Sequence, residues 1–167
     1  MPRLLQQHVN NAAVWRHHSP FAELDMEVWR RFFDINVNGT AYVTKAVIGS
    51  MLDNGYGRIV NVASVAGVYG NGKMACYSAT KGAIIAFTKA LAKEVSDKGI
   101  TVNSVSPGTV SSSSDRDIDS YTPSNMSYMG RTGSDRENAE LIRFLVSDRA
   151  PYISGENILI DGCRKLI

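Results

Sequence analysis

Two polar side chains stand four positions apart in a segment whose apolar residues recur with helical spacing. Tyr77 and Lys81 enclose the sequence Tyr-Ser-Ala-Thr-Lys, so on a helix both side chains lie on one face. A phenol has a reference pKa of about 10, and a nearby ammonium group lowers it by favouring the ionised form. The pair could therefore exchange a proton with a ligand, although a solvated Tyr–Lys pair explains the spacing equally well.

Two further polar residues precede this pair in the chain. Ser64 follows the β-branched run 58–62, and parallel α/β sheets bind ligands beyond the carboxyl ends of their strands. A hydroxyl there could hydrogen-bond a substrate oxygen, or it could simply be a turn serine. Asn36 lies in an apolar segment just ahead of Gly39, where a mid-helix amide often only satisfies a kinked backbone.

Strands and helices that alternate along the chain would position these residues. Apolar and β-branched runs predict strands at 4–9, 58–62, 100–105 and 157–160. Helical segments are expected between them, so the order predicts an α/β fold with a parallel sheet. The strands are continuously apolar rather than alternating, which predicts that both faces of the sheet are covered.

Three helices are expected between and after the strands. The first is capped by Asp25 and carries an apolar stripe through 29–47 that Gly39 interrupts. The second contains Tyr77 and ends at Gly99, and the third covers 137–145. In the second helix the apolar residues are spaced for one buried face: Ile84, Phe87, Leu91 and Val95.

The segment 109–136 differs from the rest of the chain. It is rich in Ser, Asp, Gly and Tyr and shows little periodicity. Unstructured stretches of this length are commonly functional lids or mobile segments. We expect a lid over the site.

Length and composition restrict the class of protein. The 167 residues are 44% hydrophobic and 20% charged, which fits one globular domain and argues against disorder. A net charge of +2 predicts no nucleic-acid partner and no membrane surface as partner. No apolar run reaches the roughly 18 residues of a membrane span, and the start of the chain lacks the apolar core of a secretory signal. The 2 cysteines cannot form a disulfide framework, so a cytoplasmic location is expected.

Two other motifs point to no further site. His17 and His18 have no additional ligands at metal-binding spacing, so no metal site is expected. The glycine-rich stretch 67–72 is followed by Lys73 and Met74 rather than by Lys with Ser or Thr, so it is no phosphate-binding P-loop.

Together, these motifs resemble the short-chain dehydrogenase/reductase family over nearly the whole chain from Asn10 onward. The matching segments, in order, are Asn10-Asn-Ala-Ala13, Asn36-Val-Asn-Gly39, Gly57-Arg-Ile-Val-Asn-Val-Ala-Ser64, Tyr77-Ser-Ala-Thr-Lys81, Ser106-Pro-Gly108 and Ser154-Gly-Glu-Asn-Ile-Leu-Ile-Asp-Gly162. The resemblance implies a Rossmann-like, doubly wound parallel sheet of which this chain carries only the C-terminal part, strands four to seven with their helices. Residues 1–167 would then form a single partial catalytic domain with a substrate lid at 109–136.

The resemblance also implies hydride transfer between NADP(H) or NAD(H) and a carbonyl or secondary alcohol. Tyr77 would exchange the proton, and Ser64 would orient and polarise the substrate oxygen. Lys81 would bind the nicotinamide ribose and lower the pKa of Tyr77, while Asn36 would hold a water that passes protons to Lys81. The implied cofactor-binding residues are Asn11, Ala12, Ala13, Tyr77, Lys81, Pro107, Gly108, Val110 and Ser112.

The chain departs from the family pattern at three places. The phosphate-binding loop Thr-Gly-x-x-x-Gly-x-Gly does not occur in these 167 residues, and without the strands that carry it strand four would be an open apolar edge. We therefore expect the natural polypeptide to be longer, or this chain to be a truncated form that binds the cofactor poorly. Ala13 and Cys163 each stand where the family commonly has glycine, and a buried or end-of-strand thiol is expected at Cys163.

The segments 57–62, 68–72 and 99–108 look most like 3-oxoacyl-[acyl-carrier-protein] reductases, which implies an acyl-thioester or other small-molecule substrate. Sugar, polyol and cyclic-alcohol dehydrogenases of the same family share these segments and stay an alternative. A truncated, non-catalytic fragment that acts only by association is another. The family precedent also implies a homo-oligomer, a dimer or tetramer, with the helices at 29–47 and 77–98 at one interface and the last strand at another.

Overall fold

The computed structural model describes residues 6–111 and 117–165, which form a four-stranded parallel sheet in the order β1-β2-β3-β4. The strands are β1 (Gln7–Asn10), β2 (Gly57–Val62), β3 (Ile100–Pro107) and β4 (Asn157–Ile160). The α/β prediction with a parallel sheet is confirmed. The first strand lies later than the predicted 4–9, and residues 4 and 5 are outside the described part of the chain.

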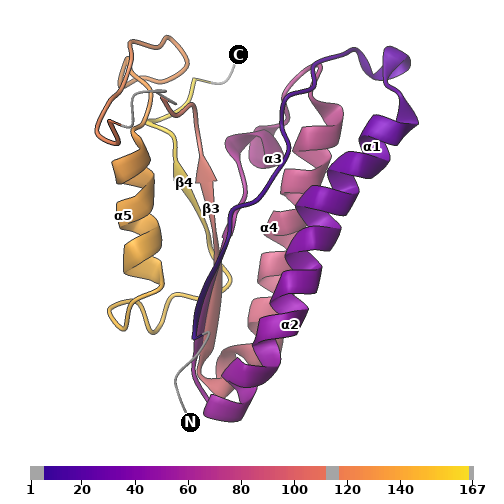
Figure 1. Cartoon of the computed structure of the whole chain (residues 1–167). Coiled ribbons are helices and arrows are strands. Elements are labelled where there is room, and N and C mark those ends of the chain that lie inside the picture. The colour runs from indigo at the N-terminus through magenta and orange to yellow at the C-terminus, as the bar shows by residue number, and fades with distance from the viewer. Residues whose placement is uncertain (1–5, 112–116, 166–167) are drawn as a thin grey trace.

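Helices flank the sheet on both sides, as Figure 1 shows. They are α1 (Met26–Phe33), α2 (Gly39–Asn54), α3 (Val65–Tyr69), α4 (Ala75–Val95) and α5 (Asp135–Leu145), with a π-helical turn η2 (Asp34–Asn38) and 3-10 turns η1 (Phe21–Glu23) and η3 (Ser96–Lys98). α2 and α4 cover one face, with α1 beside α4 at its upper end, and α5 covers the other (Figure 1). In the described part of the chain, no helix combines the length and apolar character needed to cross a bilayer.

The first helical segment is continuous where an interruption was predicted. Asp25 caps α1 as expected, accepting a hydrogen bond from the Glu27 amide at 2.9 Å. Gly39 does not break the helix, since its φ of −57° is helical and α2 starts there. The irregularity lies in η2, the π-helical turn just before it, and such turns are common at functional sites.

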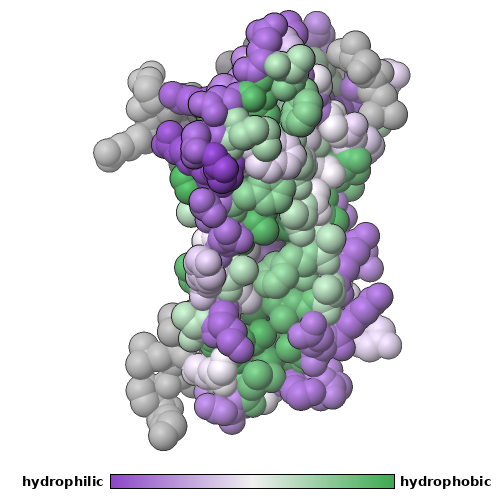
Figure 2. All heavy atoms as spheres, turned by 90° about the vertical axis from the view of Figure 1, so that its right-hand side faces the viewer, coloured by the Kyte–Doolittle hydropathy of each residue, from purple (hydrophilic) through white to green (hydrophobic). Residues whose placement is uncertain are grey.

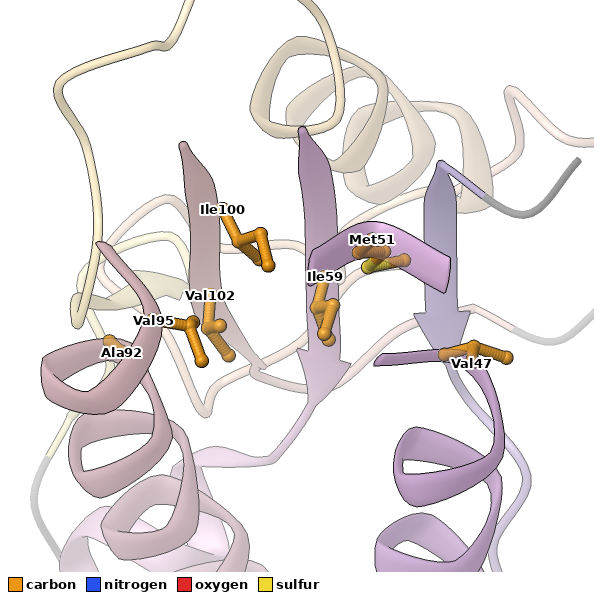
Figure 3. Packing of buried hydrophobic residues seen from close by; sticks show 7 residues of the cluster. All are labelled: Val47, Met51, Ile59, Ala92, Val95, Ile100 and Val102. Carbon is orange, nitrogen blue, oxygen red and sulfur yellow. The ribbon is translucent and has the colours of Figure 1, made fainter. Parts of the chain in front are cut away.

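The larger buried cluster lies between the sheet and α2 and α4 (Figure 3). It consists of Val47, Met51, Ile59, Ala92, Val95, Ile100 and Val102. Only part of the predicted apolar stripe of α4 belongs to the buried face: Ile84 and Val95 are buried, whereas Phe87 and Leu91 are half-buried. Thr88 and Ala92 are buried instead, because α4 packs along β2 and β3 and buries only the line of residues that faces them.

The opposite face is only partly covered. Val60, Val105 and Leu145 form a second buried cluster beneath α5. β3 is buried along almost its whole length, as expected for a strand covered on both faces, but β1 alternates between exposed and half-buried residues. The prediction of covered faces therefore holds at the centre of the sheet and fails at its β1 edge.

A paired polar ladder sets the register between β1 and β2. Asn10 stands opposite Asn61, and the Asn10 amide donates to the Asn61 side-chain oxygen at 2.8 Å. The Asn61 amide in turn donates to Thr88 of α4 at 2.9 Å. A shift of one residue in β1 would remove the Asn10 donor from the buried Asn61 side-chain oxygen, which is costly, so this pair favours a single register.

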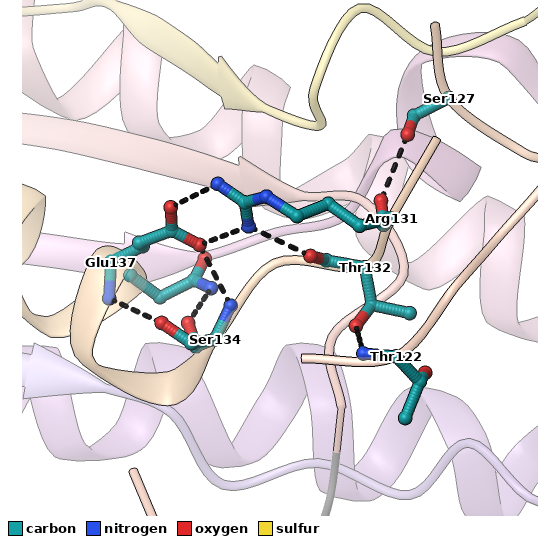
Figure 4. A network of polar contacts seen from close by, with 7 residues as sticks. Thr122, Ser127, Arg131, Thr132, Ser134 and Glu137 are labelled. Atoms are coloured by element: carbon teal, nitrogen blue, oxygen red, sulfur yellow. Dashed lines mark hydrogen bonds and ion pairs between the residues drawn. The ribbon is translucent and has the colours of Figure 1, made fainter. Parts of the chain in front are cut away.

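The described part of the predicted lid is folded against the start of α5 (Figure 4). Arg131 makes a two-pronged ion pair with Glu137, at 2.7 and 2.9 Å, and its carbonyl accepts from Ser127 at 2.8 Å. Ser134 and Glu137 form a reciprocal capping box, so α5 begins at Asp135 rather than at the predicted 137. The segment without regular structure consequently ends at 134, two residues earlier than expected.

Candidate active site

The predicted site residues gather at the carboxyl ends of the parallel strands, the upper end of the sheet in Figure 1. Asn11, Ala12 and Ala13 directly follow β1, and Ser64 follows β2. Pro107 ends β3, and Gly108 comes next. Ligands of open α/β sheets bind at this edge, so the topology alone brings three of the predicted segments together.

Ser64 and Tyr77 lie together at one end of the candidate site. Ser64 caps α3 in an extended conformation, with its oxygen accepting from the Ala66 amide at 3.1 Å. Tyr77 lies in the first turn of α4, and burial raises its pKa while a hydrogen bond with Ser64 lowers it by a smaller amount. Desolvation penalises the phenolate, so the phenol keeps its proton at neutral pH.

Lys81 lies one turn further along α4, 4% exposed, with its Nζ 5.8 Å from the centre of the Tyr77 ring. Burial lowers the pKa of Lys81 to about 8. The ammonium was expected to lower the pKa of Tyr77, but in this structure that pKa is raised, because desolvation by burial outweighs the lowering effect of Ser64. In the described part of the chain Nζ makes one hydrogen bond, to the Val62 carbonyl at 2.6 Å, which leaves two donors for a ligand.

Asn36, buried in the π-helical turn η2, connects three segments of the site. Its side-chain oxygen accepts from the Val14 amide at 2.8 Å, and its nitrogen donates to the Val14 carbonyl at 3.0 Å and to Thr80 at 3.1 Å. Thr80 also donates to the Tyr77 carbonyl at 2.9 Å. Both amide donors are used within the protein, so this side chain holds the backbone after β1 against the helix that carries Tyr77 and Lys81.

Two glycines permit the close approaches on which the site depends. A Cβ on Gly67 of α3 would lie 2.5 Å from the Lys81 backbone carbon, so only glycine lets α3, and Ser64 before it, pack against α4. A Cβ on Gly108 would lie 2.9 Å from Asp161, which brings the turn after β3 against the end of β4. Glycine is needed at both positions because neighbouring atoms pack closely there, not because φ is unusual.

The other predicted cofactor residues that the structure describes lie at the same edge with different degrees of exposure. Asn11 and Ala12 are exposed, and Ala13 is half-buried. Val110 pairs in an isolated bridge with Gly133 and is half-buried. Ser112 lies outside the described residues. The donors at this edge, the Tyr77 hydroxyl and the two spare N–H groups of Lys81, have the chemistry to bind ribose hydroxyls and so fit the nicotinamide half of a dinucleotide.

Three residues of the site were not predicted. The backbone of Val14 and the side chain of Thr80 form hydrogen bonds with the side-chain amide of Asn36, and the Val62 carbonyl accepts one from Lys81 Nζ. Thr80 stands directly before Lys81, so its place next to a candidate residue was a usable signal. The two backbone partners have no side-chain signature and come only from the three-dimensional arrangement.

The two cysteines and the possible metal ligands are the remaining candidate features. Cys76 is 1% exposed and packs as a small hydrophobic residue. Cys163 ends the last strand region but is exposed rather than buried, and its φ of 57° is the left-handed conformation that favours glycine. Among the described residues no group of three or more His, Cys, Asp or Glu side chains could hold a metal ion.

Comparison with known proteins identifies the family to which this chain belongs. A family model described as enoyl-(acyl carrier protein) reductase matches residues 4–163. The 3-oxoacyl-[acyl-carrier-protein] reductase of Synechocystis sp. is 39% identical over 155 residues, and that of Escherichia coli K12 is 37% identical over 157, each across 92% of this chain. The chain belongs to the short-chain dehydrogenase/reductase family. A 2-dehydro-3-deoxy-L-rhamnonate dehydrogenase (NAD(+)) of Sphingomonas sp. is 38% identical over 87% of the chain.

Solved structures of the family confirm the Rossmann-like fold. A 3-oxoacyl-[acyl-carrier protein] reductase with bound NAD from Brucella melitensis superposes with a TM-score of 0.87 at 30% identity, over 97% of this chain and 63% of the other. ElxO with NADP bound gives a TM-score of 0.87 at 30% identity, over 95% of this chain and 66% of the other. The chain spans 62% of the Synechocystis reductase, 64% of the E. coli reductase and 59% of the Sphingomonas dehydrogenase.

Proposed function

We propose that this chain provides the catalytic part of an oxidoreductase that interconverts a carbonyl and a secondary alcohol with NADP(H) or NAD(H). The observation that carries the proposal is the convergence of Ser64, Tyr77 and Lys81 at one edge of the sheet, with Ser64 close enough to Tyr77 to lower the pKa of its phenol and Lys81 Nζ 5.8 Å from its ring centre. The related reductases and dehydrogenases support the reaction class.

A bound nicotinamide would supply or accept hydride at the substrate carbon. The protein's own side chains bind the substrate oxygen and exchange a proton with it. Tyr77 donates its proton to the oxygen as charge develops there, and its raised pKa keeps that proton available at neutral pH. The Ser64 hydroxyl donates a second hydrogen bond to the same oxygen, and a preorganised donor of this kind contributes about 3 kcal/mol to transition-state stabilisation. Lys81 uses its two spare donors on the ribose.

Asn36 has a positioning role in this scheme. It holds the segment after β1 and, through Thr80, the helical turn that carries Tyr77. The proton relay to Lys81 through a water near Asn36 stays a prediction, and the hydrogen bonds of its side chain favour a relay water held by neighbouring backbone rather than by the amide nitrogen.

The nicotinamide half of the cofactor would lie against Asn11, Ala12, Ala13, Pro107, Gly108, Val110 and Ser112, together with Tyr77 and Lys81. These 167 residues contain no phosphate-binding Thr-Gly-x-x-x-Gly-x-Gly loop. Because that loop supplies most of the pyrophosphate contacts, we expect the isolated chain to bind the cofactor weakly.

The 3-oxoacyl thioester is our first choice of substrate, because the Synechocystis and E. coli relatives are named as reductases of that group. The Sphingomonas sugar-acid dehydrogenase and an Acinetobacter cyclohexanol dehydrogenase, 35% identical, keep polyol and cyclic-alcohol oxidation as the second candidate.

A homo-oligomer is the expected assembly. Figure 2 shows hydrophobic side chains forming a band down the face of α2 and α4, bordered by hydrophilic ones. A groove of about 470 Å³ runs there, lined in part by Ile48, Leu52, Phe87 and Leu91. Exposed apolar surface of this kind is characteristic of protein–protein contacts, and a second copy of the chain is the partner we propose.

The experiment that tests the function compares wild type with Tyr77→Phe in the polypeptide encoded by the whole reading frame, including in-frame codons ahead of Met1. Reduction of a 3-oxoacyl thioester is followed by NADPH absorbance, and cofactor affinity by calorimetry. Loss of the proton donor should lower kcat by about 10² to 10⁴ with the cofactor dissociation constant unchanged. Wild-type turnover in the variant would refute the role of Tyr77. An inactive wild type whose reading frame encodes no phosphate-binding loop ahead of Met1 would support a fragment that acts by association.

A further inference from the structure

A cleft of about 340 Å³ opens beside the segment that follows β1. It is lined by Ala13, Val14, Trp15, Arg16, His17, Val28, Arg31 and Phe32. None of Asn36, Ser64, Tyr77 or Lys81 lines it, so its function can be argued separately from the reaction. Its volume lies in the range of small-molecule sites.

Two guanidinium groups without carboxylate partners line this cleft. In the described part of the chain, neither Arg16 nor Arg31 forms an ion pair, and no Asp or Glu lines the cleft. Arg30, next to Arg31 on α1, is by contrast paired with Glu27. Two unpaired cations at one concave surface create a local positive potential that attracts an anion.

The rest of the lining is apolar and aromatic. The Arg16 guanidinium lies 5.3 Å from the centre of the Trp15 ring. The Phe32 ring is buried, and its centre lies 6.4 Å from that of the His17 ring, with the two planes 69° apart. Guanidinium groups bind oxyanions through paired N–H donors, and aromatic rings beside them accept a flat apolar group. The lining therefore combines an anion subsite with an apolar subsite.

We propose that this cleft binds a phosphate monoester with an apolar or aromatic body, with Arg16 and Arg31 on the phosphate and Trp15 against the body. Two guanidinium groups match the charge of a phosphate better than that of a single carboxylate. The proposal does not depend on the proposed oxidoreductase activity, because no residue assigned to the reaction lines the cleft except Ala13 of the expected cofactor segment.

Occupancy would have a structural consequence at the reaction site. The Val14 backbone in the cleft wall is bonded to both ends of the Asn36 amide, at 2.8 and 3.0 Å. A ligand that displaces this wall would therefore alter the hydrogen bonds of Asn36, which holds the segment after β1 against α4.

The test titrates phenyl phosphate into the ¹⁵N-labelled 167-residue chain at low ionic strength and follows the two indole N–H signals. Trp29 is the internal reference, since it stacks on Phe33 at 5.0 Å and does not line the cleft. We expect a saturable shift of the Trp15 signal only, with binding weakened roughly tenfold or more in Arg16→Gln and Arg31→Gln. Arg30→Gln is the matched control and should bind within about twofold of wild type.

Binding of three further compounds tests which chemical class of ligand the cleft accepts. Phenol should cause no shift, benzoate should bind more weakly than phenyl phosphate, and inorganic phosphate should bind more weakly because it lacks the apolar body. Equal binding of phenol, equal binding of inorganic phosphate, or unchanged affinity in both arginine variants with native circular dichroism would each overturn the proposal.

Discussion

At the scale of single residues, the site is built from groups whose burial changes their protonation. The pKa of Tyr77 is raised and that of Lys81 is lowered to about 8, both chiefly by desolvation. Burial thus keeps the phenol protonated and destabilises the ammonium before any ligand arrives. A ligand that offers hydroxyl oxygens to Lys81 would recover part of that penalty, so binding and charge are coupled at this residue.

The lowered pKa of Lys81 has a defined effect on stability. Its ordinary value is 10.5 and its folded value about 8, so between these pH values the unfolded chain binds more protons and stability rises with pH. Below pH 8 the full penalty applies, on the order of 3 kcal/mol. The stability gain of Lys81→Met over wild type should therefore shrink as pH rises from 7 to 10, measured by urea unfolding. Lys98→Met, at an exposed lysine bonded to Asp97, should show no such trend, and a pH-independent difference for Lys81 would contradict the assignment.

Cys163 stores strain in its backbone. Its φ of 57° costs an ordinary residue about 1 kcal/mol relative to glycine. Cys163→Gly should accordingly raise the midpoint of thermal unfolding, despite the greater flexibility that glycine adds to the unfolded chain. Cys163→Ala removes the thiol but keeps the strain and should change little, so equal gains in both variants would attribute the effect to the thiol.

At the scale of elements, the short helix α3 is held against α4 by the absence of a side chain at Gly67. An added Cβ would meet the Lys81 backbone at 2.5 Å, and backbone cannot move aside as a flexible side chain can. Gly67→Ala should therefore destabilise the fold by about 1 to 3 kcal/mol and displace Ser64 from Tyr77.

Chemical denaturation measures the first effect. The pKa of Tyr77, from an NMR titration of the ring-labelled protein in which its signal is assigned with Tyr77→Phe, reports the second. Gly72→Ala, in the adjoining loop with no atom within 4 Å of the added Cβ, is the matched control and should stay close to wild type. Equal destabilisation of both variants would show that loop flexibility, not the close approach, is what the glycines provide.

At the scale of the whole molecule, the sheet is asymmetric. α2 and α4 cover one face, while α5 covers the other and β1 forms a half-exposed edge (Figure 1). The band of apolar residues on the outer side of α2 and α4 adds a second exposed apolar surface (Figure 2). A chain with such surfaces is expected to associate.

Association through α2 and α4 can be tested by placing a charge in the groove. Leu91→Glu should shift the sedimentation profile toward the monomer, because a carboxylate in an apolar interface is left unpaired. Leu91 is only half-buried within one chain, so the fold should persist. Tyr152→Glu, at a fully exposed residue outside the groove, is the control, and an unchanged oligomeric state in Leu91→Glu would remove this face as the interface.

Local chemistry determined a large share of this protein. β-branched runs placed β2, β3 and β4, the Asp25 cap placed the start of α1, and the spacing of Tyr77 and Lys81 placed both on one face of α4. These features depend on neighbours in the sequence, whose geometry is set by backbone periodicity. The order of strands and helices then predicted which strand ends would meet.

Tertiary structure alone decided the rest, because it depends on contacts between distant segments. Asn36 bonds to Val14 and Thr80 across the fold, and that contact makes the π-helical turn tolerable where a break at Gly39 was expected. The burial that raises the pKa of Tyr77 comes from the surrounding fold and overrides the shift expected from Lys81. The orientation of α4 on the sheet likewise buries Thr88 and Ala92 more fully than Phe87 and Leu91, since the direction of packing, not apolar character alone, decides which face of a helix is buried.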